Sequence, residues 1–312
     1  MHKEILQCIS FTEKRLKTLR QELGNALSNK SYAVVTGGSY ARREASEQSD
    51  LDWFIICDSA EAKKQGERDL KKISGLVKKV VNADPAEDGA FGRIETIGEM
   101  IKNIGGKNDG NFKITRRILL LLEGEWLYDQ SRFMDYRSQI LGRYIRPTIS
   151  DHQFCRFLLN DLIRYYRTIC VDFEHKTTEA GKEWGIRNLK LVFSRKLLYF
   201  SGVLVAAESW QHSFATKDQK IKHLLALSPI GRIHEVCGAR AEPALNAYGV
   251  FLGKMADPSI RAMAKKVTEI KDEHPEEFRL FKNEGHHFSW MLTKLLKDTY
   301  DTSHPIHNAL IV

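Results

Sequence analysis

Residues 32–57 read YAVVTGGSYARREASEQSDLDWFIIC, and this stretch decides the fold of the first half of the chain. Tyr32 to Thr36 is short, apolar and β-branched, which predicts a buried strand. Gly37-Gly38-Ser39 ends that strand sharply, in a turn where glycine lets the backbone expose its N–H groups. Leu51 to Cys57 is again apolar and predicts a second buried strand. The stretch is therefore a strand, a glycine turn, a spacer and a strand.

Two carboxylates, Asp50 and Asp52, stand at the start of the second strand. Side chains alternate along a strand, so both lie on one face, about 6–7 Å apart, and Leu51 points into the core. Such a pair is costly unless a cation neutralises it, and Mg²⁺ prefers one or two carboxylates with substrate phosphates and water. The alternative is a surface turn followed by two solvated aspartates, which the apolar run Trp53–Ile56 argues against.

The joined pattern GS-x10-D-x-D, with a strand on either side, resembles the signature of the DNA polymerase β-like nucleotidyltransferase superfamily. The resemblance covers residues 32–57, and the rest of the first half is compatible with it. It implies that Gly38 and Ser39 bind the β- and γ-phosphates of a nucleoside triphosphate, and that Asp50 and Asp52 bind two Mg²⁺ ions. The helical second half resembles the companion domains of smaller members, such as the aminoglycoside nucleotidyltransferases.

The family pattern also needs a third carboxylate, on a later strand, which ligates a metal and helps to activate the attacking hydroxyl. Glu95, in the segment RIETI at 93–97, has the required apolar neighbours and is the first candidate for this catalytic role. Asp109, in the loop that follows, is a rival. The remaining alternative is that there is no third carboxylate, which would put catalysis in doubt.

Four basic residues are further candidates for nucleotide binding. Arg42 and Arg43 follow the phosphate turn and are placed to reach triphosphate oxygens. Arg187 and Lys190 share one helix face in the second half. If that helix packs against the first domain, they are placed to close on the triphosphate or on the acceptor. The alternative for each pair is a solvated, charged helix face.

The chain of 312 residues is long enough for about two domains, and its pattern changes near Pro147. We predict an α+β protein: a small mixed-sheet polymerase β-like nucleotidyltransferase core over 1–147, followed by an all-α helical-bundle domain over 148–312. In the first domain we expect a third strand over 90–97 and helices over 3–28, 61–81, 115–126 and 133–144. In the second we expect helices over 151–174, 184–207, 217–227, 242–255, 259–272 and 276–298.

Composition narrows the class of protein. Hydrophobic residues make up 42% and charged residues 28%, which is typical of a soluble globular protein and excludes disordered, collagen-like and coiled-coil chains. No apolar run approaches the length of a membrane-spanning helix, and the amino terminus has no signal-peptide pattern. Five cysteines without a C-x-x-C pair predict buried free thiols and a cytoplasmic location.

The charge permits a phosphate-bearing partner without requiring one. Lys and Arg number 48 against 40 Asp and Glu, a net charge of +8. The excess is even, +4 in residues 1–150 and +4 in 151–312, which argues against a strongly basic nucleic-acid arm. No Walker A, G-x-G-x-x-G, G-x-S-x-G or zinc-ligand spacing occurs, so P-loop, Rossmann and hydrolase interpretations lose their usual support.

We therefore expect an enzyme, a Mg²⁺-dependent nucleotidyltransferase that moves a nucleoside monophosphate from NTP to an acceptor hydroxyl and releases pyrophosphate. The sequence leaves open which NTP it uses, the oligomeric state, and whether the acceptor is a small molecule, a protein, tRNA or another nucleotide. The alternative is a non-catalytic nucleotide- or RNA-binding module, or a toxin–antitoxin-type partner, that retains the fold.

Overall fold

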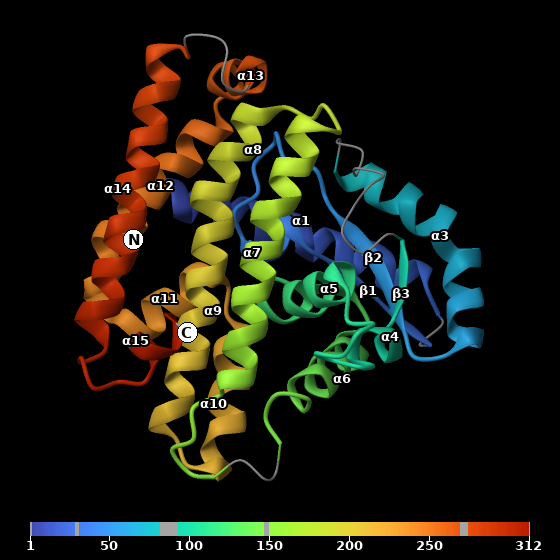
Figure 1. Cartoon of the computed structure of the whole chain (residues 1–312). Coiled ribbons are helices and arrows are strands. Elements are labelled where there is room, and N and C mark those ends of the chain that lie inside the picture. Colours follow the sequence, from blue (N-terminus) through green and yellow to red (C-terminus); the bar gives the residue numbers. More distant parts are fainter. Residues whose placement is uncertain (1, 29–30, 82–92, 147–149, 269–273, 312) are drawn as a thin grey trace. The chain divides into compact units, whose positions relative to one another are not determined.

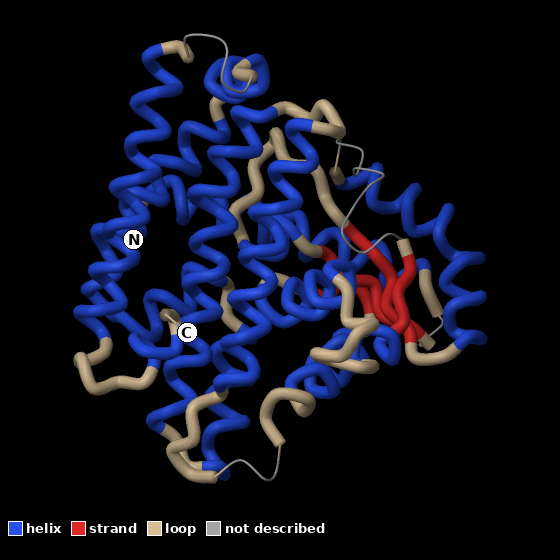
Figure 2. Tube along the Cα trace, in the orientation of Figure 1, coloured by secondary structure: helices blue, strands red, loops and turns tan. Residues whose placement is uncertain are grey.

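The computed structural model describes residues 2–28, 31–81, 93–146, 150–268 and 274–311. The chain divides into two compact units, one of Gln7–Thr148 and one of Met1–Leu6 with Ile149–Val312. The first holds a four-stranded mixed sheet with helices, and the described part of the second is helical (Figure 2). The predicted fold class, an α+β core followed by a helical region, is confirmed. The predicted domain boundary at 147–148 falls outside the described residues and stays a prediction.

The sheet of the first unit has the strand order β3-β2-β1-β4. The strands are β1 (Tyr32–Thr36), β2 (Trp53–Cys57), β3 (Ile94–Thr96) and β4 (Glu125–Tyr128). β1 pairs antiparallel with β2 and with β4, whereas β3 runs parallel to β2. The register pairs Thr36 with Trp53. The turn that follows β1 therefore lies beside the residues that precede β2.

Among the described residues, the helices that accompany the sheet are α1 (Lys3–Ala26), α2 (Gly38–Arg42), α3 (Ala60–Val80), α4 (Ile97–Ile101), α5 (Asn111–Leu122) and α6 (Gln130–Leu141). One face of the sheet packs against α1 and α3, with Leu16, Val77 and Ile55 in the same core cluster (Figure 1). Burying a side chain of this size stabilises the fold by about 1.5–3 kcal/mol. α6 packs against β1. This core fixes β1 and β2, and so the site between them.

The described part of the second unit contains helices of different lengths. They are α7 (Arg156–Thr178), α8 (Trp184–Lys190), α9 (Lys196–Glu208), α10 (Phe214–Ala226), α11 (Pro229–Cys237), α12 (Glu242–Ala256), α13 (Pro258–Lys266), α14 (Glu276–Thr299) and the short α15 (Ile306–Ala309). A π-helical segment, Leu191–Arg195, joins α8 to α9, and short 3₁₀ segments span Ser209–Gln211 and Gly238–Ala241. Phe193 of the π-helical segment stacks on Phe251 and Phe288 at ring-centroid distances of 4.5 and 5.2 Å.

Several elements differ from the prediction. The helix expected over 115–126 ends at Leu122 and gives way to β4, because Gly124 turns so close to the helix that a Cβ there would lie 2.6 Å from the Leu120 carbonyl oxygen. The single helix expected over 184–207 contains the π-helical segment, and the helix expected over 259–272 ends at Lys266. The short helices α4, α11 and α15 were not predicted.

Two composition-based predictions can be compared with the structure. All five cysteines are free thiols, and four of them are buried, whereas Cys170 is half-exposed. Among the described residues, no helix combines the length and apolar character needed to cross a membrane.

Candidate functional site

The turn after β1 is tied to the residue that precedes β2. The Gly37 N–H donates to the Asp52 carbonyl oxygen at 3.0 Å, and the Thr36 hydroxyl donates to the same oxygen at 2.7 Å. Gly38 then adopts a φ of 67°, a left-handed conformation that favours glycine, and begins α2. These hydrogen bonds hold the backbone of Asp52 against the end of β1.

The Asp52 side chain lies against Gly38. A Cβ placed at residue 38 would lie 3.0 Å from Oδ2 of Asp52, so the absence of a side chain leaves room for the carboxylate. Leu51 is fully buried in the core cluster, whereas Asp50 and Asp52 are half-buried, which confirms the predicted alternation. The glycine turn and the second carboxylate of the pair therefore meet in one place.

Ser39 and Tyr40 continue the turn. Ser39 is half-buried, and its carbonyl oxygen accepts from the Glu44 N–H at 2.8 Å, which closes the short helix. Tyr40 is 2% exposed beneath it. Burial raises the pKa of Tyr40 to about 12; Arg15 opposes the rise, and Glu47 and Asp50 add to it. The phenol is neutral at physiological pH, and the buried ring packs beneath the turn.

Arg42 is buried in an ion-paired cluster beside the turn. Its Nε donates to Glu44 at 2.7 Å and its Nη1 to Glu123 at 2.5 Å, and all three residues are at most 7% exposed. Oε1 of Glu123 lies 3.7 Å from the position of a Cβ on Gly37. The buried cluster thus packs against the turn at Gly37. Contact between Arg42 and a nucleotide stays a prediction.

Sequence reasoning missed the two carboxylates that pair with Arg42. Glu123 is separated from Arg42 by 81 positions, so no local pattern links them. One signal was present: Glu123 directly follows the apolar run Ile118–Leu122, where a charged side chain needs a partner. Long-range pairs of this kind become visible only once the elements are placed.

Arg43 has a different environment. It ends α2 with a φ of 63°, and its guanidinium forms ion pairs with Glu13 at 2.8 Å and Glu125 at 2.6 Å. These contacts join α1, the turn and β4. The predicted contact of Arg43 with phosphate oxygens stays a prediction.

Glu95 lies on β3, away from the glycine turn along the sheet. It is opposite Ile56, four residues beyond Asp52, which is about 13 Å at the usual strand rise. Its carboxylate forms an ion pair with Arg116. Across the ranges that the structure describes, no three His, Cys, Asp or Glu residues gather as metal ligands would. The third-carboxylate role of Glu95 gains no support from this placement and stays a prediction.

Asp109, the rival to Glu95, is fully buried. Its two carboxylate oxygens accept from Nη1 and Nη2 of Arg117, each at 3.0 Å, and Oδ2 also accepts from the Gly105 N–H at 2.9 Å. Both side chains of the pair have no exposed surface. This arrangement gives Asp109 a structural role in the loop before α5.

Arg187 and Lys190 lie on α8 in the helical unit. The Nε atom of Arg187 is buried and makes no hydrogen bond within the described part of the chain. Lys190 is exposed. Their predicted contact with a triphosphate stays a prediction.

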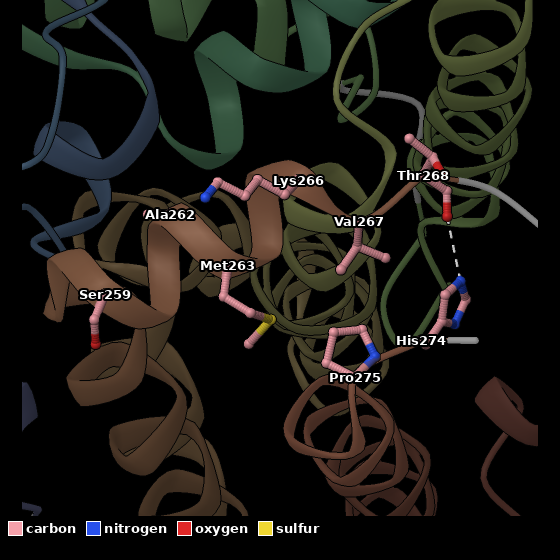
Figure 3. A pocket seen from close by; sticks show the side chains of 8 residues that line it. All are labelled: Ser259, Ala262, Met263, Lys266, Val267, Thr268, His274 and Pro275. Atoms are coloured by element: carbon pink, nitrogen blue, oxygen red, sulfur yellow. Dashed lines mark hydrogen bonds between the residues drawn. The ribbon is translucent and has the colours of Figure 1, made fainter. Parts of the chain in front are cut away.

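A cavity of about 390 Å³ lies beside α13 in the same unit (Figure 3). Its lining includes Met263 and Lys266, together with His274, whose Nε2 lies 3.2 Å from the Thr268 carbonyl oxygen. None of the predicted site residues lines this cavity.

The residues at the turn fit a hard divalent cation. Asp50 and Asp52 offer carboxylate oxygens and are half-buried, so water and substrate phosphates can share the coordination sphere. Neither histidine nor cysteine belongs to the pair, which disfavours a zinc-type site. The donor set matches what Mg²⁺ requires when it is bound together with a nucleotide.

Comparison with known proteins adds an independent finding. Residues 16–102 match the family described as the nucleotidyltransferase domain. No curated protein matches the chain. The matched segment contains the glycine turn, the Asp50–Asp52 pair and Glu95. Residues 16–102 therefore form a nucleotidyltransferase domain of the DNA polymerase β-like superfamily.

Proposed function

We propose that the chain is a Mg²⁺-dependent enzyme that transfers a nucleoside monophosphate from NTP to an acceptor hydroxyl. The nucleotidyltransferase domain over residues 16–102 supports nucleotidyl transfer in general. One observation supports the proposed site most directly: a Cβ on Gly38 would lie 3.0 Å from Oδ2 of Asp52. A glycine turn in contact with one carboxylate of an aspartate pair suits the binding of a metal-complexed triphosphate.

In this proposal the chain contributes to catalysis by positioning the triphosphate and by holding the cations that neutralise its charge. Backbone N–H groups at Gly38 and Ser39 bind phosphate oxygens, and Asp50 and Asp52 hold magnesium. Magnesium, when bound, neutralises phosphate charge and acts as a Lewis acid. The acceptor oxygen forms a bond to the α-phosphorus while the bond to the bridging oxygen breaks, so pyrophosphate leaves with the electron pair and the hydroxyl proton passes to solvent.

The basic residues have secondary roles in the proposal. Arg187 and Lys190 are the candidates from the helical unit, and the unpaired Nε of Arg187 offers a donor for a phosphate oxygen. For Arg42 and Arg43, binding a nucleotide requires exchange of their present carboxylate partners. In their present ion pairs, both arginines help to hold the glycine turn in its conformation.

The test uses the full chain with each of the four NTPs labelled at the α-phosphate, Mg²⁺, and RNA, protein and small-molecule fractions of a cell extract as acceptors. We expect label in one fraction and release of pyrophosphate, both lost when EDTA removes Mg²⁺ and restored when Mg²⁺ is returned in excess. Label and pyrophosphate no greater than in the EDTA sample, for all four NTPs and all fractions, would contradict the proposal. The fraction that takes label identifies the class of acceptor.

Replacing Gly38 with alanine should lower transfer by about tenfold or more. The left-handed conformation costs an L-residue about 1–2 kcal/mol, and the new Cβ would press on the Asp52 carboxylate. Gly105→Ala is the matched control, because Gly105 has a φ of 78° and nothing within 4 Å of a Cβ. Both variants should lose similar stability in thermal unfolding, and only Gly38→Ala should lose pyrophosphate release. Equal loss of transfer in both would show that contact with Asp52 is not the cause.

A further inference from the structure

A second cavity, of about 360 Å³, lies within the helical unit and is lined by residues from α7, α9 and α14 and by Leu310. None of the residues assigned above to nucleotide binding lines it. Its size is at the lower end of the range for small-molecule sites. The chemistry of its lining indicates the kind of molecule that it fits.

Lys196, at the start of α9, is the charged group in the lining. Its Nζ donates to the Ser289 hydroxyl at 2.5 Å, and that hydroxyl in turn donates to the Gly285 carbonyl oxygen at 2.8 Å. An ammonium group carries three donors. Within the described residues Lys196 has no ion pair and no second hydrogen-bond partner, so two donors are left for a ligand.

In the part of the chain that the structure describes, no acidic side chain forms an ion pair with Lys196. Burial lowers the pKa of the Lys196 amine, and the neighbouring Cys170 opposes this only in part. Burial likewise raises the pKa of the Cys170 thiol and raises that of Tyr199 to about 12, so both groups are neutral at physiological pH. A half-buried cation without a counter-ion is stabilised when an anion binds beside it.

The rest of the lining is apolar or aromatic. Phe200, Val203 and Leu292 are each at most 7% exposed, and their side chains line the cavity. Tyr166 and Tyr199 are stacked, with ring centroids 4.6 Å apart and ring planes at 17°, and both also line it. A ligand must therefore present an apolar body as well as an anionic group.

The segment before Lys196 gives independent support. Leu191–Arg195 is π-helical. This conformation is rare in proteins, and where it occurs it often lies at a functional site. Gly285 of α14 packs directly on it, since a Cβ there would lie 2.6 Å from Cγ1 of Val192. This close approach brings Ser289, one helical turn further on, within hydrogen-bond distance of Lys196.

We propose that this cavity is a binding site for a small organic carboxylate with an apolar body, held by the Lys196 ammonium. Two free donors match the two oxygens of one carboxylate. The lining residues of this cavity are different from those proposed to bind the nucleotide, and the test does not depend on catalysis.

The experiment compares matched acids and alcohols by calorimetric titration of the full chain without nucleotide. The probes are octanoate against 1-octanol, and 2-naphthoate against 2-naphthalenemethanol, which separate a chain-shaped body from a flat one. We expect at least one acid to bind about tenfold or more tightly than its alcohol, the range of a charge-assisted hydrogen bond. Lys196→Met should remove this preference, Lys196→Arg should retain it, and Lys265→Met, at an exposed lysine of α13, should leave it unchanged.

A second readout uses the unmutated protein, in case Lys196→Met does not fold. The preferred acid, but not its alcohol, should slow acetylation of Lys196 by acetic anhydride, followed by peptide mass spectrometry, and leave acetylation of Lys265 unchanged. The proposal is overturned if neither acid binds saturably, if acid and alcohol bind equally, or if the acid fails to protect Lys196.

Discussion

Replacing Asp52 with asparagine should lower the rate of pyrophosphate release on the order of 10²–10³-fold, the loss typical when a group that stabilises transition-state charge is removed. The substitution keeps the size of the side chain and removes its charge, so metal binding weakens. The fold should survive, because Gly37 and Thr36 hold the Asp52 carbonyl oxygen, which the variant retains. Initial rates at saturating NTP and Mg²⁺ measure the effect, and thermal unfolding checks the fold. Asp50→Asn should give a loss of the same order.

The matched control for Asp52→Asn is Asp58→Asn. Asp58 follows the other end of β2, is 45% exposed and pairs with Arg132 at 2.7 Å, so its substitution removes the same charge at the opposite end of that strand. Its rate should stay within about twofold of the wild type, since an exposed ion pair contributes little. Equal rates for Asp52→Asn and Asp58→Asn would contradict the assignment of Asp52 to the metal.

The part of the site that could be predicted is the part encoded locally. The bounds of β1 are those expected, and β2 differs from its prediction only in its first two residues. The alternation of half-buried Asp50, buried Leu51 and half-buried Asp52 follows from the period of two along an extended chain. Hydrophobic pattern and strand geometry were enough for this, because both operate within a few residues.

The remainder depends on contacts between distant positions. β4 follows directly on an apolar helical pattern, and the end of that helix involves contacts of Glu123 and Gly124 with Leu119 and Leu120 that the pattern does not contain. The pairing of Arg42 with Glu123 joins segments that the sequence does not relate. Glu95 had the expected apolar neighbours, but the register of β3 on β2 decides where it lies, and no single-strand pattern contains that register.

Asp109 illustrates the same limit and leads to the prediction with the largest effect on stability. In the sequence Asp109 is a polar residue in a glycine-rich loop, and this setting is as typical of a catalytic aspartate as of a structural one. In the structure Arg117 binds it with two parallel hydrogen bonds and also donates to the Met100 carbonyl oxygen at 3.0 Å and the Tyr144 hydroxyl at 2.6 Å. This fully buried pair anchors the loop to α5.

Replacing Arg117 with methionine should therefore destabilise the protein by about 3–5 kcal/mol, because it leaves the Asp109 charge buried without its partner. The adjacent Arg116 is the matched control: it is 24% exposed, and Arg116→Met should cost about 1 kcal/mol. In Asp109→Asn/Arg117→Met no charge is buried, and the amide oxygen can still accept from Gly105, so the double variant should lose less than Arg117→Met alone. Urea unfolding of the three variants measures these differences. Similar losses for Arg116→Met and Arg117→Met, or a double variant weaker than the single one, would show that the buried charge is not what makes Arg117 necessary.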